Sequence, residues 1–143
     1  MPPILKRRDA ALKISQPLPG AASTTVNSLP IDLQKTANGN MLALFEVEVA
    51  APDVNTTMNP DTRTQTYSLI TGNALDANGK IDSPTVLMAS VIVQTGADGA
   101  GAPASVFRCR LPEHVGRYVA LRIVSGASTT NASAVSATLD LLF

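Results

Sequence analysis

The sequence predicts an all-β domain: an antiparallel β-sandwich of about eight strands, jelly-roll-like, with an extended N-terminal arm. Three observations lead to this fold class. Apolar residues recur at every second position in several short stretches, as a strand buried on one face requires. Polar segments rich in Gly, Pro, Asn and Asp separate those stretches. No stretch of ten or more residues has a convincing helical period, although residues 4–14 come nearest, so parallel βαβ units are disfavoured.

Length, charge and composition set further bounds. At 143 residues and 14.8 kDa the chain predicts one domain, residues 10–143, behind an arm of residues 1–9. Eleven basic and eleven acidic residues give a formal net charge of zero, so the sequence lacks the global charge typical of proteins that bind nucleic acid or a membrane surface. No apolar run of signal-peptide or bilayer-spanning length is present, so neither Sec export nor a membrane partner is expected.

The N-terminal arm carries a basic cluster. Pro2 and Pro3 oppose a helix, which favours an extended arm. Lys6, Arg7 and Arg8 follow them. The cluster is either a solvated tail or a contact with an acidic partner surface, which includes a neighbouring subunit.

Four strands are predicted in the N-terminal half. They are residues 11–15, 24–33, 41–50 and 65–72. Pro30 makes the second an edge strand or interrupts it at a bend. In the third strand Val47 and Val49 share the core face, and the carboxylates of Glu46 and Glu48 share the opposite, solvated face. Such a pair of like charges is far more common on the wet face of a sheet than in an acid/base site.

Two long connections favour a sandwich over a barrel. Residues 51–63 and 73–84 are longer than usual loops and suit Greek-key crossovers better than an up-and-down meander. The second loop has alternating polar residues that are faintly similar to a calcium loop. Lys80 occupies a would-be ligand position there, however, and no bidentate acid closes the loop. A turn at Asn78-Gly79 is therefore expected, and no metal or other cofactor.

The C-terminal half contains four more predicted strands, residues 86–95, 106–111, 118–124 and 134–143. The apolar run 86–95 is expected to be covered on both faces in its middle. The glycine-rich segment 96–103 reads as a hairpin tip, because a phosphate-binding loop needs a helix directly after it and here a strand follows.

Residues 104–125 are predicted to form the centre of the fold. Its expected core residues share two strand faces: Phe107, Cys109, Leu111, Val119, Leu121 and Ile123. Arg108 and Arg110 fall on the opposite face, where their guanidinium groups are expected to pair with Glu46 and Glu48 or with a neighbouring subunit. The single cysteine rules out an internal disulfide and, on the core face, behaves as a small hydrophobic group.

The sequence offers no catalytic constellation. The only histidine, His114, lies in a turn beside Glu113, where adjacent side chains normally point in different directions. One histidine and one cysteine cannot supply a structural zinc site within one subunit. We therefore expect the protein not to be an enzyme.

The chain resembles a known family over most of its length. The similar segments are LKRRDAALKIS with the following Pro-Leu-Pro, MLALFEVEV, SVIVQTGADGAGAPASVFRCRLPEHVGRYVALRI and SAVSATLDLLF. They resemble the small jelly-roll cement, or decoration, proteins of tailed bacteriophages. The marks of the resemblance are the Gly/Ala tip between two strands, the Leu-Pro before a turn, the Arg117-Tyr118-Val119 strand opening and the Leu-Leu-Phe end.

The resemblance implies a structural virion protein, made in the host cytoplasm, that binds the outside of an icosahedral head and stabilises contacts between major capsid proteins. It also implies a homo-oligomer, with a dimer favoured, and no direct contact with nucleic acid. The basic arm and loops such as 51–63 and 96–102 would contact the capsid. The contact residues expected on this interpretation are Lys6, Arg7, Arg8, Arg63, Arg108 and Arg110.

An alternative from another class is a carbohydrate- or receptor-binding β-sandwich module of a phage tail or fibre. Such sites usually stack sugars on exposed aromatic rings. The chain has two tyrosines, three phenylalanines and no tryptophan, so it is poorly supplied for that role.

Overall fold

The computed structural model describes residues 8–34, 46–54, 62–97 and 100–142. These residues form nine strands and no helix, so no helix among them is long and apolar enough to span a membrane. The strands are β1 (Arg8–Pro17), β2 (Thr25–Asn27), β3 (Ile31–Asp32), β4 (Glu46–Ala51), β5 (Thr64–Gly72), β6 (Thr85–Thr95), β7 (Ser105–Arg110), β8 (Tyr118–Ser125) and β9 (Ser136–Leu142).

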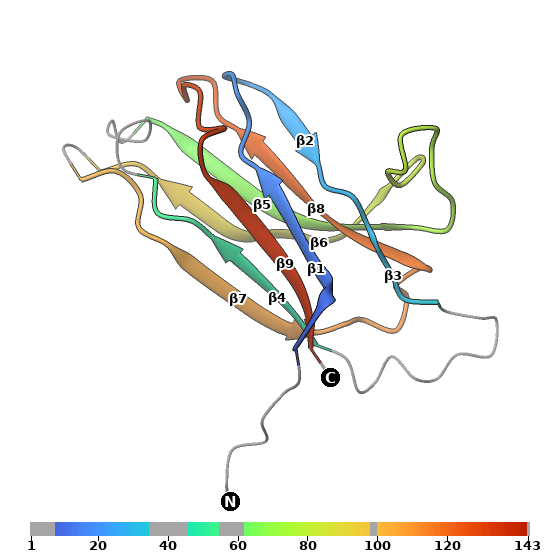
Figure 1. The fold of residues 1–143 in the computed structure, drawn as a ribbon. Helices are drawn as coiled ribbons and strands as arrows, with labels where there is room; N and C mark the ends of the chain where they lie inside the picture. Colours follow the sequence, from blue (N-terminus) through green and yellow to red (C-terminus); the bar gives the residue numbers. More distant parts are fainter. Residues whose placement is uncertain (1–7, 35–45, 55–61, 98–99, 143) are drawn as a thin grey trace, which may run out of the picture.

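The strands form two antiparallel sheets packed face to face (Figure 1). We call the sheet with the strand order β1-β9-β4-β7 sheet A. Sheet B has the order β2-β8-β5-β6, and β3 also pairs with β8. The prediction of an all-β antiparallel sandwich is confirmed.

The strand pairs are nested along the chain. β1 pairs with β9, β2 and β3 pair with β8, β4 pairs with β7, and β5 pairs with β6. The chain therefore doubles back as one long antiparallel ribbon. This ribbon is rolled so that β4 meets β9 and β5 meets β8. That is the strand order of a jelly roll, and the long connections are its crossovers between sheets.

A short break separates β2 from β3, where the sequence predicts a bend at Pro30. At this break the Ser28 side chain takes over a ladder position, because the Leu121 N–H donates to Ser28 Oγ over 2.9 Å. The Ser28 N–H in turn donates to the Leu121 carbonyl over 2.8 Å. Proline can neither donate in a ladder nor continue a regular strand, so the interruption follows from its chemistry.

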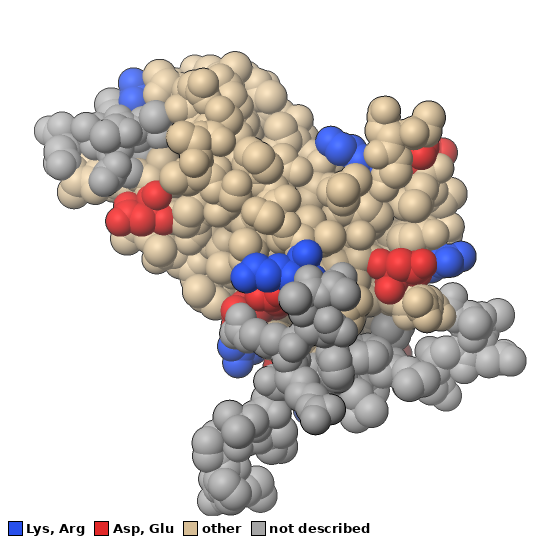
Figure 2. Space-filling model, viewed as in Figure 1, with Lys and Arg blue, Asp and Glu red and all other residues tan. Residues whose placement is uncertain are grey.

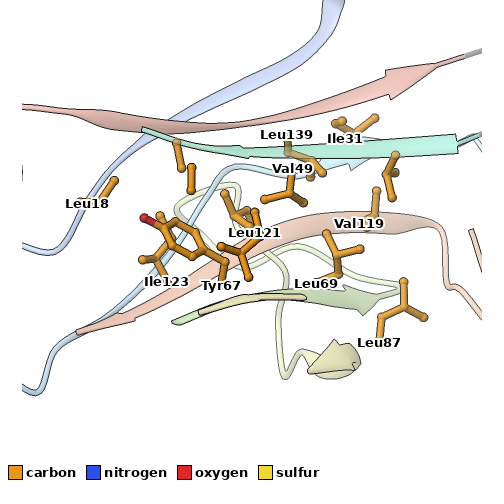
Figure 3. Close-up of a cluster of buried hydrophobic side chains, with 14 of the residues drawn as sticks. Leu18, Ile31, Val49, Tyr67, Leu69, Leu87, Val119, Leu121, Ile123 and Leu139 are labelled. Carbon is orange, nitrogen blue, oxygen red and sulfur yellow. The ribbon is translucent and has the colours of Figure 1, made fainter. Parts of the chain in front are cut away.

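The inner faces of the two sheets form the core (Figure 3). Val49 and Leu139 from sheet A lie opposite Tyr67, Leu69 and Leu121 from sheet B. The core residues expected in the 104–125 unit are confirmed, since Leu111, Val119, Leu121 and Ile123 are buried and Phe107 and Cys109 pack partly buried against them.

The loop of residues 73–84 packs on the outer face of sheet B. Its Ile81 covers Ile70 and Ala120, and Tyr118 packs against the same small cluster. The expected turn is present, with Gly79 at φ 76°. The Asp76 carboxylate accepts hydrogen bonds from the backbone N–H groups of two residues in this turn, so turn chemistry explains its position.

The expectation for residues 86–95 is wrong. β6 is an edge strand of sheet B, and Val86 and Val93 are 52% and 55% exposed. Its ladder with β5 shifts register twice, once between Ile92 and Met88 and once between Met88 and Val86. Ser90, in the first of these bulges, has a left-handed φ of 52°, and its N–H donates to Ser68 Oγ. The bulge turns the strand, so an apolar sequence lies at an edge and not between two covered faces.

The N-terminal boundary also differs from the expected one. β1 begins at Arg8, whose backbone position pairs with Leu142, so Arg8 and Asp9 belong to a strand and not to an arm. Residues 1–7 and residues 41–45 of the expected third strand lie outside the described residues.

Candidate interaction surface

A row of charged residues crosses the outer face of sheet A. Lys13 on β1 is the register partner of Asp140 on β9. Asp140 is the partner of Glu48 on β4, and Glu48 is the partner of Arg108 on β7. Four neighbouring strands thus contribute one residue each, two carboxylates in the middle and a cation at each end. We call these four residues the charged row.

The carboxylates of the charged row are buried and its cations are exposed. The side chains of Glu48 and Asp140 are 8% and 6% exposed, whereas those of Arg108 and Lys13 are about half exposed. Arg108 donates from Nε to Glu48 Oε2 over 3.0 Å and also from Nη2 to the same oxygen. Lys13 Nζ lies 4.0 Å from Asp140 Oδ2. The predicted pairing of Arg108 with Glu48 is confirmed.

The burial of Glu48 corrects the expectation of a solvated carboxylate. It does face away from the core, but its side chain is only 8% exposed. A buried carboxylate is stable only when it is paired and hydrogen-bonded, and Arg108 supplies both. The hydrogen bond to Glu48, with the charge of Glu48 and then of Glu46 adding to it, raises the pKa of Arg108, so this guanidinium stays charged.

The geometry prepares Arg108 to bind a further acceptor. A guanidinium has five N–H donors in a fixed plane, and the two bonds to Glu48 leave others available on the exposed side. Arg110 lies on the same face of β7, in register with Glu46, and is exposed. Within the described parts of the chain no hydrogen bond or ion pair involves the Arg110 side chain.

Charged side chains are sparse on this side of the molecule. On the face shown in Figure 2 they lie in a few separate places, some with basic and acidic residues adjacent and others with one sign only, and the surface between them is largely uncharged. This distribution agrees with the zero net charge of the sequence. Electrostatic contacts of this surface are therefore local and short in range.

Of the other expected contact residues, only Arg63 has a described side chain. Arg63 directly precedes β5 in sheet B and donates to Thr130 Oγ1 over 3.3 Å, so the fold does not bring it into the charged row. Lys6 and Arg7 lie outside the described residues, and of Arg8 only the backbone position in β1 is described.

Sequence reasoning missed two members of the charged row, Lys13 and Asp140. A signal for each was present, because each is a charged residue that alternates with apolar ones in a strand. Their meeting depends on which strands are neighbours, and a single strand's alternation does not contain that information.

Arg117 forms a second ion pair near the start of β8. Its Nε and Nη2 donate to the two carboxylate oxygens of Asp32 over 3.1 and 2.9 Å. This hydrogen bond holds the pKa of Asp32 below its usual value. The Arg117 Cζ also lies 5.1 Å from the centre of the Tyr118 ring. The pair fastens β3 to the beginning of β8, which is a structural role.

Aromatic rings offer little to a sugar in the described part of the chain. Tyr67 is fully buried, Phe107 packs against the core, and the Tyr118 ring lies beneath Arg117. Carbohydrate sites need an uncovered ring face for stacking.

The residues considered for catalysis are not assembled into a site. Burial, and then the Glu46 carboxylate, raise the pKa of Cys109, whose Sγ lies 3.5 Å from Met88 Sδ. A thiol in such surroundings is a poor nucleophile. His114 is exposed in its turn. Among the residues that the structure describes, no group of three or more His, Cys, Asp or Glu could hold a metal ion.

Comparisons of the chain with protein-family models, with curated proteins and with solved structures found no match. The fold, the charged row and the features of the sequence are therefore what indicate a function for this chain.

Proposed function

We propose that the protein is a structural virion protein that binds the outer surface of a tailed-bacteriophage head and stabilises contacts between major capsid proteins. The observation that carries this proposal is the charged row, in which a buried carboxylate holds the exposed Arg108 in place. A guanidinium fixed before binding loses less side-chain entropy on contact with a partner carboxylate. The resemblance of the sequence to phage cement proteins supports the same function.

A capsid lattice makes modest contacts sufficient. Each exposed arginine contributes little by itself, because surface ion pairs are typically worth no more than about 1 kcal/mol. Many identical sites on one particle, and a homo-oligomer that engages two of them at once, raise the effective affinity without new contacts. A dimer on the capsid exterior fits this mechanism and needs no cofactor.

Co-sedimentation with undecorated heads tests the proposal. Purified protein is mixed with heads at limiting concentration, and the bound fraction is measured. We expect the wild-type protein to sediment with the heads. The double variant Arg108→Lys/Arg110→Lys keeps both charges but loses the planar donor fork, so its occupancy should fall several-fold while its circular dichroism shows the folded sandwich.

Arg122→Lys is the matched control, because Arg122 lies on sheet B and donates to Asn27. It should bind heads like the wild type. Full occupancy by the double variant would contradict the role of the two arginines. Absence of wild-type binding would contradict the proposed function itself.

A further inference from the structure

One edge of sheet A, the outer edge of β7, is regular and uninterrupted. β7 pairs with β4 over six consecutive residues without a register shift, and its other edge pairs with no strand that the structure describes (Figure 1). The β6 edge of sheet B is different, because the bulge at Ser90 interrupts that strand. Bulges discourage the addition of a further strand, whereas a regular edge permits it.

The outward face of β7 has a defined chemistry. Val106 is 63% exposed, and the exposed Arg108 and Arg110 follow at alternate positions. β4 already shows which side chains match this pattern from the other side. Its Ala50, Glu48 and Glu46 are the register partners of those three residues in the same order.

We propose that the free edge of β7 binds an extended acidic segment of a partner protein by antiparallel strand addition. The segment has two carboxylates at alternate positions, opposite Arg110 and Arg108, and a small apolar residue opposite Val106. Backbone hydrogen bonds along the edge supply affinity, and the two guanidinium groups fix the register, since a slip of one residue would turn the carboxylates to the other face. The inference rests on the proposed function where it takes this partner to be the major capsid protein.

A second copy of β7 fits the same edge less well. In an antiparallel two-fold pairing centred on Phe107, Arg108 lies opposite Val106. In one centred on Arg108, the two copies of that guanidinium face each other. Residues 105–110 contain no carboxylate, so no two-fold register gives the arginines an acidic partner. Charge complementarity therefore favours a different, acidic chain.

A peptide probe tests the edge directly. The probe carries the β4 sequence Glu46–Ala51 between Ser-Gly flanks and a fluorophore, and binding to the whole protein is followed by anisotropy. We expect saturable binding that weakens with salt. A control peptide with both glutamates replaced by lysine should bind at least about tenfold more weakly, because like charges then oppose each other. Equal binding of the two peptides would overturn the inference.

Two substitutions of exposed valines form a matched pair. Val106→Glu places a negative charge beside the two arginines, where it repels the acidic peptide, and should abolish peptide binding, whereas Val93→Glu makes the same change on β6 and should not. In hydrogen exchange, the backbone amides of β7 should exchange more slowly when the peptide is bound than in the free protein. Wild-type binding by the Val106→Glu protein, or added protection at another strand, would overturn the inference.

Head binding separates this inference from the proposed function. If heads bind wild type and Val106→Glu equally, the capsid function stands and the strand addition is wrong. If the peptide binds β7 but heads bind neither protein, the edge site stands and the capsid assignment is wrong. If the peptide does not bind and the β7 amides of the wild-type protein gain protection as its concentration rises, the edge is occupied by a second copy.

Discussion

Single buried polar side chains hold the loop end of the sandwich together. Gln94 uses all of its amide there: Nε2 donates to the Pro52 carbonyl over 2.7 Å and to the Pro103 carbonyl over 2.9 Å, while Oε1 accepts from the Tyr67 hydroxyl over 2.6 Å. One side chain from sheet B thus fixes the segment after β4 and the segment before β7. We therefore expect substitutions in this hydrogen-bond network, and at its neighbour Gln65, to change the stability of the fold.

The Tyr67→Phe substitution should destabilise the fold. It removes the donor to Gln94 Oε1 and leaves a buried acceptor without a partner, which costs about 1–3 kcal/mol. Urea unfolding measures the loss. Tyr118→Phe is the control, because Tyr118 is only partly buried and should change the free energy of unfolding by much less.

Comparison with Tyr67→Phe also isolates the contribution of Tyr67 to the pH dependence of folding stability. Burial raises the pKa of Tyr67 above its ordinary value. Above about pH 10 the unfolded chain therefore loses the tyrosine proton while the folded chain keeps it, and stability falls by up to about 1.4 kcal/mol per pH unit. The stability gap between wild type and Tyr67→Phe should narrow as the pH rises from 9 to 11. A gap that widens would contradict this assignment.

Gln65→Met should stabilise the protein. Gln65 is fully buried, and neither amide atom has a hydrogen-bond partner in the described structure. Methionine has a similar shape and no amide to desolvate, so we expect a gain of about 1–3 kcal/mol in chemical denaturation. A loss of similar size would show that the amide is satisfied in solution, for instance by a buried water.

At the scale of elements, close backbone approach limits the connection from β7 to β8. A Cβ added at Gly116 would lie 2.7 Å from the Gly72 carbonyl oxygen, and that atom belongs to the backbone of β5. The Gly116 N–H also donates to Thr71 Oγ1 over 2.8 Å. The connection therefore sits directly against the end of β5 and has no space for a side chain.

Gly116→Ala should destabilise the protein by about 1–3 kcal/mol in thermal or urea unfolding, as overpacking does. Gly20→Ala is the matched control. The nearest atom to its added Cβ is 3.6 Å away, which is ordinary contact, and a change within about 0.5 kcal/mol is expected. Equal stability of the two variants would mean that the β7–β8 connection can move aside.

At the scale of the whole molecule, the nested ribbon brings the first and last strands together. β1 and β9 are antiparallel neighbours, and Arg8 pairs with Leu142 (Figure 1). A circular permutant is therefore geometrically simple: a Gly/Ser linker joins the ends, and the chain is opened between Glu113 and His114, both exposed.

We expect this permutant to keep the strand spectrum and to unfold cooperatively, because every strand pair is preserved. Opening the chain between Leu121 and Arg122 is the control, since it cuts β8, which pairs with β5 on one side and with β2 and β3 on the other. That form should not fold. A permutant opened at 113–114 that fails to fold would mean that the order in which the ribbon closes matters as much as its final pairs.

Features of the fold and of the charged row could be predicted from the sequence where they depend on residues close together in the chain. Alternation at every second residue is local, so the sequence alone identified the strands, the core faces of β4, β7 and β8, and the shared face of Arg108 and Glu48. The bend at Pro30 and the turn at Gly79 were also predictable, because proline lacks a donor and glycine accepts a left-handed φ.

The sequence by itself determined the fold class, which residues point inward on most strands, and a pair of arginines on an outer face. Tertiary structure alone decided that β6 and β7 are edges, that Ile81 buries Ile70 on the outer face of sheet B, and that Lys13 and Asp140 complete the charged row. The physical reason is the same in each case. A strand's faces follow from its own residues, but its neighbours follow from contacts between segments far apart in the chain.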